Sequence, residues 1–83
     1  MSEISFNYTG TPPEHFKKSL FDAVRLTMAD IKTEVLANKG FIQLDYHSDD
    51  DIDIRAVSSN AETTMKMTIK LQGLMAGHKL RGN

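Results

Sequence analysis

The sequence contains no cysteine, and this absence removes several classes of function at once. Disulfides, thiolate nucleophiles, zinc knuckles and iron–sulfur clusters all need cysteine, so the stability of the fold has to come from packing. No apolar run approaches the roughly 20 residues of a membrane helix, and the start of the chain lacks the basic and apolar regions of a signal peptide. We therefore expect a protein that is located in the cytoplasm and has no contact with a membrane.

Short motifs for catalysis and phosphate binding are also missing. The sequence has no Gly-x-Ser-x-Gly elbow, no Gly-x-Gly-x-x-Gly loop and no Walker pattern. The three histidines, His15, His47 and His78, form no pair at the spacing of metal ligands. We expect a protein that is not an enzyme and that holds no cofactor.

The composition is that of a small globular domain. Of the 83 residues, 40% are apolar and 25% are charged, and a chain of this length has a thin core. We place one α+β domain at residues 1–77 and a short basic tail at residues 78–83. The net charge of −1 hides an asymmetry, because every charged residue after Glu62 is basic. These residues are the candidate contacts for nucleic acid or an acidic partner, and they are Lys66, Lys70, Lys79 and Arg81.

Alternation of apolar and polar residues predicts three strands, in segments 4–9, 41–47 and 52–56. Between the first two, residues 14–38 carry apolar side chains at helical spacing, which predicts a helix of about 25 residues. The side chains expected to face the core from this helix are Phe16, Leu20, Ala23, Val24, Thr27, Met28, Ile31 and Val35. Such a helix is longer than the strands beneath it, so part of it should overhang the sheet.

Capping patterns mark the helix ends. Thr11 with Glu14, and Ser59 with Glu62, have the spacing of capping boxes at two helix starts. Glycines follow both segments, Gly40 after the first and Gly77 after the second, and glycine commonly ends a helix in a left-handed conformation.

The last third of the chain is ambiguous between strand and helix. Residues 64–71 alternate as a strand does, whereas the second capping box and the following glycine favour a helix over 60–76. We therefore predict a β-α-β-β-α two-layer sandwich, with two helices on one face of a three-stranded sheet. The alternative is β-α-β-β-β, with residues 63–71 as a fourth strand.

The second and third predicted strands form a hairpin, since Ser48-Asp49-Asp50 between them has turn chemistry. Pairing Leu44 with Ile54 places the apolar side chains of both strands on one buried face, which predicts the register. The crossover rule then suggests that the third strand lies between the first two. In this topology the first strand is an exposed edge of the sheet.

Acidic residues crowd the hairpin. In the predicted register Asp45 lies directly across from Asp53, and like charges in that arrangement are unfavourable. A metal ion or a basic partner would relieve the repulsion, and the weak candidate metal ligands are Asp45, His47, Asp49, Asp51 and Asp53. The spacing lacks the Gly and Glu of a calcium loop, so a solvated turn without a metal is the preferred interpretation.

A thin core, an exposed strand edge and an overhanging helix together predict self-association as a homodimer. The candidate partner or dimer surface consists of Leu26, Ala29, Leu36, Met67, Leu74 and Met75. Our leading hypothesis is a non-catalytic accessory protein that binds another protein. The alternatives are a nucleic-acid-associated protein that uses the basic C-terminal third, and a small metal- or ligand-binding domain at the acidic hairpin.

Overall fold

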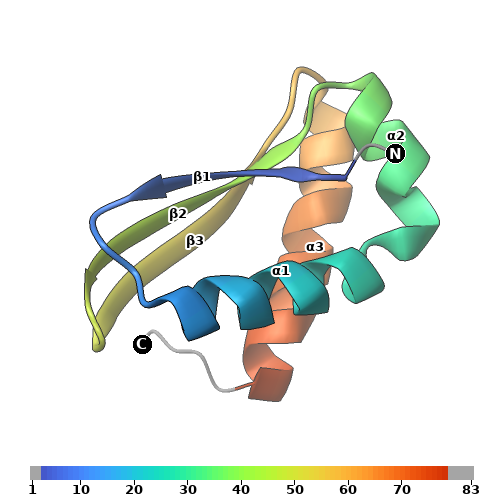
Figure 1. The fold of residues 1–83 in the computed structure, drawn as a ribbon. Coiled ribbons are helices and arrows are strands. Elements are labelled where there is room, and N and C mark those ends of the chain that lie inside the picture. The colour runs from blue at the N-terminus through green and yellow to red at the C-terminus, as the bar shows by residue number, and fades with distance from the viewer. Residues whose placement is uncertain (1–2, 79–83) are drawn as a thin grey trace.

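The computed structural model describes the backbone of residues 3–78 and the side chains of residues 3–75. Its elements are β1 (Ser5–Thr9), α1 (Glu14–Thr27), the 3₁₀ turn η1 (Ala29–Ile31), α2 (Lys32–Ala37), β2 (Phe41–Ser48), β3 (Asp51–Val57) and α3 (Ala61–His78). The strands form one sheet, and the helices pack on one of its faces (Figure 1). This is the predicted α+β arrangement, and the ambiguous last third is a helix. None of the described helices is long and apolar enough to cross a bilayer.

The hairpin has the predicted register. Leu44 pairs with Ile54, Tyr46 with Ile52, and Ile42 with Ala56. These residues share the face toward the helices, because alternate residues of a strand point to the same face. Ile42, Leu44 and Ile54 are buried there, and Tyr46, Ile52 and Ala56 are half-buried. The rest of the core comes from the first helical segment (Leu20, Val24, Met28 and Val35) and from α3 (Met67, Leu71 and Leu74), with Ile4 at the start of the chain.

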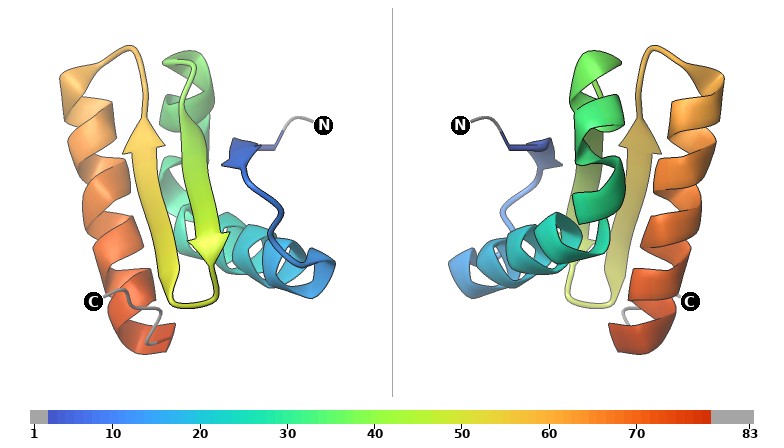
Figure 2. Two further views of the ribbon diagram at one scale, coloured as in Figure 1. Left: turned by 90° about the vertical axis from the view of Figure 1, so that its left-hand side faces the viewer. Right: turned by 90° about the vertical axis from the view of Figure 1, so that its right-hand side faces the viewer.

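The order of the strands differs from the prediction. β2 is the central strand, with β1 parallel to it on one side and β3 antiparallel to it on the other. The prediction that the third strand lies in the middle is wrong. A β-α-β crossover can place its two strands side by side, and the sequence pattern does not say on which side of the hairpin the first strand docks. Within the described residues the sheet therefore has two free edges, β1 and β3 (Figure 2).

The single long helix expected at 14–38 is instead two helices that meet at an angle (Figure 1). Met28 leaves helical geometry (φ −102°, ψ 15°), and its carbonyl accepts a hydrogen bond from the Ile31 N–H at 3.1 Å. Met28 and Val35, on either side of this break, both point into the core, where both are fully buried. α2 therefore runs in a different direction from α1 instead of continuing it (Figure 1).

The predicted capping at both helix starts needs correction, although α1 begins at Glu14 as predicted. Pro13 precedes α1 and makes no side-chain capping bond, so the first capping box does not form. At α3 the cap is shifted by one residue, since the Asn60 Oδ1 accepts the Thr63 N–H at 3.0 Å. The Ser59 hydroxyl donates instead to the Asn38 carbonyl at 2.9 Å and ties the start of α3 to the end of α2.

The predicted helix ends also need correction. Lys39, not Gly40, adopts the left-handed conformation after α2, with φ 57°. Gly40 is needed for space, because an added Cβ would lie 2.5 Å from the Val35 Cγ1 and 3.1 Å from the Met67 Sδ. α3 continues past Gly77, which therefore does not end it. The predicted tail is in part helical backbone, and residues 79–83 lie outside the described residues.

Candidate protein-binding surface

The outer side of α3 carries two large apolar side chains in solvent. Met65 is 63% exposed and Ile69 is 61% exposed. Residues four apart are neighbours on the same face of a helix, so these side chains form one continuous row. The row continues to Gly73, where an added Cβ would meet no atom within 4 Å. We call Met65, Ile69 and Gly73 the α3 row; clustered apolar side chains at a surface are a feature of protein-binding sites.

The side of α3 that faces the other helices is charged. The Lys66 Nζ lies 3.0 Å from the Glu34 Oε1, and the Lys70 Nζ lies 2.9 Å from the Asp30 Oδ2. The hydrogen bond from Lys66 holds the pKa of Glu34 below its usual value, and the bond from Lys70 does the same for Asp30. In turn Glu34 raises the pKa of Lys66. These two ion pairs join α3 to α2 and η1.

A buried polar group lies at one end of this charged side. Thr63 is only 1% exposed, and its hydroxyl donates to the Glu34 Oε2 at 3.0 Å. The same hydroxyl accepts from the Asn38 Nδ2 at 3.1 Å, and that amide also donates to the Glu34 carbonyl at 2.9 Å. Every buried side-chain N or O atom in the described part of the chain has a partner. These bonds hold the start of α3 to α2, and Met65 and Ile69 lie on the outer side of the helix.

The basic residues proposed as nucleic-acid contacts are only in part described. Lys66 and Lys70 are engaged with carboxylates of the same chain. Lys79 and Arg81 lie outside the described residues. Two of the four predicted contacts therefore already have partners within the fold.

The predicted partner residues are not brought together by the fold. Met67 and Leu74 are buried core residues and are not part of any surface of the folded chain, and Met75 packs against the core. Leu26 is 72% exposed, but the break after α1 separates it from Leu36 on α2. Ala29 is exposed within the intervening 3₁₀ turn.

Sequence reasoning missed Met65 and Ile69 as a surface. The alternation over residues 64–71 gives α3 apolar side chains all around its axis, so a helical projection does not select the buried side. The deciding signal is the burial of Met67, Leu71 and Leu74 against the rest of the core, and it exists only in the folded chain.

The acidic hairpin has internal partners for some of its carboxylates. Asp45 accepts hydrogen bonds from the Thr9 Oγ1 at 2.8 Å and from the Gln43 Nε2 at 3.0 Å. These bonds, that from Thr9 first, lower the pKa of Asp45 and keep it charged. Asp45 lies directly across from the exposed Asp53, as predicted. Two like charges therefore face each other on the uncovered face of the sheet.

The five candidate metal ligands are spread along the hairpin: Asp45, His47, Asp49, Asp51 and Asp53. In the described residues no three His, Asp or Glu side chains come close enough to hold a metal ion. Asp49 instead accepts a hydrogen bond from the Tyr46 hydroxyl and raises the pKa of that phenol. The fold does not assemble these side chains into a metal centre.

The β1 edge is flanked by aromatic side chains. Phe6 stacks on Tyr8 with ring centroids 6.1 Å apart, and Phe21 of α1 lies 5.8 Å from Phe6. The Lys17 Nζ lies 5.2 Å from the centroid of the Tyr8 ring. α1 therefore covers part of the helix-facing side of this edge at Phe6, whereas Tyr8 remains exposed.

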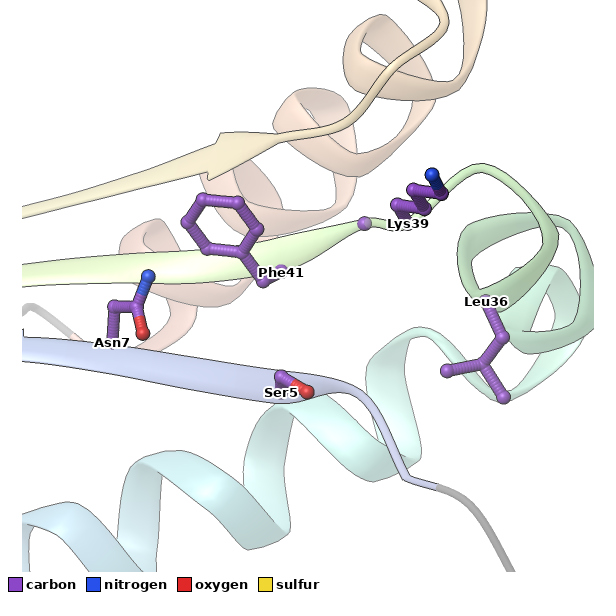
Figure 3. Close-up of a pocket in the computed structure, with 6 residues that line it drawn as sticks. Ser5, Asn7, Leu36, Lys39 and Phe41 are labelled. Atoms are coloured by element: carbon purple, nitrogen blue, oxygen red, sulfur yellow. The ribbon is translucent and has the colours of Figure 1, made fainter.

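An open depression of about 330 Å³ lies where β1 and β2 begin (Figure 3). It is lined by Ser5, Asn7, Leu36, Lys39, Gly40 and Phe41. Figure 3 shows Ser5, Asn7 and Phe41 on the two strands, with Leu36 coming from α2. Leu36, which was predicted to be part of the partner or dimer surface, lines this depression.

Comparisons of this chain with protein-family models, with curated proteins and with solved structures give no significant match.

Proposed function

We propose that this chain is a non-catalytic accessory protein that binds protein and acts as a homodimer, with the α3 row as the contact between the two copies. The observation that carries the proposal is the exposure of Met65 and Ile69 side by side on one helix face. The cytoplasm remains the proposed location.

Two copies of α3 fit each other in an antiparallel arrangement. If a two-fold axis passes at Ile69, this residue meets its own copy, and Met65 faces Gly73 of the other chain. Met65 is then a protruding side chain opposite a position without one, and Gly73 has open space for it. Such an alternation of large and small residues allows two helices to approach closely.

The expected dimer is weak. Four apolar side chains, two from each copy, contribute roughly 1–2 kcal/mol each when the exposed part of each is buried. The sum of roughly 4–8 kcal/mol corresponds to a Kd between about 1 mM and 1 μM. Because association also costs entropy, the weaker end of this range is expected.

Light scattering or sedimentation over a hundredfold dilution, from about 1 mM to 10 μM, tests the proposal. The parent chain should change from dimer to monomer as it is diluted. Met65→Glu with Ile69→Glu should be monomeric throughout, because charges buried in the contact would lack partners. Gly73→Leu should also be monomeric, since it fills the space that Met65 of the other copy needs.

The matched control is Leu26→Glu, which places a charge at an equally exposed leucine on a different helix. This variant should dimerise as the parent does. A parent chain of 9.3 kDa at every concentration would reject the homodimer, and a monomeric Leu26→Glu would move the contact from α3 to α1.

A further inference from the structure

The outer edge of β3 is available for pairing. β3 has seven residues, and its hydrogen-bonded neighbour among residues 3–78 is β2 alone. α3 runs beside β3 on the helical side of the sheet (Figure 2). A free edge presents unpaired backbone N–H and C=O groups, which can accept another strand.

The uncovered face of β3 is acidic near its start. Asp51 and Asp53 are exposed and point to the same face, because they are two residues apart in a strand. Asp45 on β2 lies across from Asp53, so this end of the face carries negative charge on both strands. Arg55, also exposed on this face, makes the following part of β3 basic, so the acidic surface is confined to the start of the strand. A strand added outside β3 would place a side chain within about 4.5–5.5 Å of Asp53, Cβ to Cβ. A basic side chain there is favourable and an acidic one is not.

The opposite face of β3 is apolar and incompletely covered near the same end. Ile52 and its cross-strand partner Tyr46 are half-buried, whereas Ile54 is buried. Figure 1 shows the cause, because the hairpin diverges from α3 toward its turn. Apolar side chains of an added strand would extend this surface next to Ile52.

The β1 edge does not have these properties. β1 has five residues, and on the uncovered face it carries Ser5, Asn7 and Thr9, none of which is charged. On its helix-facing side Phe21 of α1 contacts Phe6 and Lys17 of α1 lies over the Tyr8 ring, which is still 38% exposed. A basic segment therefore has a complementary surface at β3 and not at β1.

We infer that the free edge of β3 docks an extended basic segment of another protein, in which lysine or arginine alternates with apolar residues, as an added strand. The basic side chains lie beside Asp51 and Asp53, and the apolar ones lie beside Ile52. This inference goes beyond the proposed homodimer and does not depend on it, since the α3 row points away from the core that α3 shares with the sheet.

A synthetic seven-residue peptide, Lys-Val-Lys-Val-Lys-Val-Lys, is the probe, and the same peptide with Glu for each Lys is its control. Titration followed by NMR should show binding of the lysine peptide alone, with slower amide hydrogen exchange in residues 51–57. The affinity should fall about tenfold between 50 mM and 300 mM salt, because the contacts between charged groups are exposed and screened. Asp53→Lys should weaken binding about tenfold, whereas Asp22→Lys, which makes the same change in net charge on α1, should change it less than twofold.

Backbone N-methylation separates strand addition from simple charge attraction. Methylating alternate peptide amides should abolish binding in one of the two alternating patterns and leave the other nearly unchanged, because only one edge of the peptide bonds to β3. Equal binding by both patterns, or no binding by the unmodified lysine peptide, would overturn the inference. Asp53→Lys also removes the repulsion with Asp45, so loss of binding in this variant is not explained by unfolding. Met65→Glu with Ile69→Glu should still bind the peptide, which separates this test from that of the homodimer.

Discussion

A simple amphipathic helix turns its apolar side toward the rest of the protein and its polar side toward solvent. Two sides of α3 show the reverse. The side toward α2 and η1 carries Lys66 and Lys70, each paired with a carboxylate, and the buried Thr63. The side toward solvent carries Met65 and Ile69. The contrast shows that polarity alone does not decide which side of this helix is covered by other parts of the chain.

The physical reason is a third side of α3, which lies between these two and faces the core. Met67, Leu71 and Leu74 form a buried column on α3, and burial of such side chains contributes roughly 1.5–3 kcal/mol each. Partly exposed ion pairs contribute much less, because solvent screens the attraction between their charges. The column therefore determines the side of α3 that faces the core, the ion pairs refine its rotation, and Met65 and Ile69 remain outside.

The largest expected effect is a loss of stability, and it distinguishes the buried column from the α3 row. Met67→Ala should lower the free energy of unfolding by about 2–5 kcal/mol, because it removes a fully buried side chain and leaves a cavity. Met65→Ala should change it by less than about 0.5 kcal/mol in the monomer. Urea unfolding of dilute protein measures both, and similar losses in the two variants would contradict the described rotation of α3.

A smaller effect is expected on the charged side and depends on pH. The pKa of Glu34 and that of Asp30 are lower in the folded chain than their usual values of 4.5 and 3.8. Each carboxylate therefore stabilises the fold above its unfolded pKa, and this stabilisation is lost as the pH falls through the lower folded pKa. Glu34→Gln should be less stable than the parent at pH 7, and the difference should be smaller at pH 3, because the pH has then fallen toward the lowered folded pKa of Glu34. Thermal unfolding at the two pH values is the measurement, and an equal difference at both would show that Glu34 does not act through its charge.

The smallest expected effect is a gain in stability from a substitution on the outer side of α3. Gly73 lies in the interior of α3, and a Cβ there would meet no atom within 4 Å. Gly73→Ala should therefore raise the free energy of unfolding by about 0.5–1 kcal/mol, since alanine restricts the unfolded chain and favours helix. Denaturant unfolding at concentrations below dimer formation tests this. A loss of stability would mean that the outer side of α3 is less open than described.

Local patterns of the sequence were sufficient for much of the fold. The pairing of Leu44 with Ile54 was predicted correctly, because a shift of one residue would expose every apolar side chain of the hairpin. The core residues of the first helical segment, such as Leu20 and Val24, were also correct. The helical state of α3 was correct as well, although the capping residue is Asn60 and not Ser59.

The candidate site was predicted only in part. The register of the hairpin places Asp45 across from Asp53, and this register was predicted. The charge at the start of β3 was therefore visible in the sequence. The sequence did not show that the outer edge of β3 is free. The hairpin formed by β2 and β3 has the same internal pattern whether β1 pairs with β2 or with β3. The α3 row was missed for a related reason, because its exposure depends on where the other helices lie.

The sequence by itself determined the three strands, the helical character of the segment between the first two, how the hairpin pairs and which side of α1 is buried, because these properties depend on residues close together in the chain. The tertiary structure alone decided the central position of β2, the break at Met28 and the side of α3 that meets Glu34 and Asp30. Each of these depends on competition between distant segments for a single core. The exposed Met65 and Ile69 are a product of that competition, since one core cannot cover every apolar side of α3.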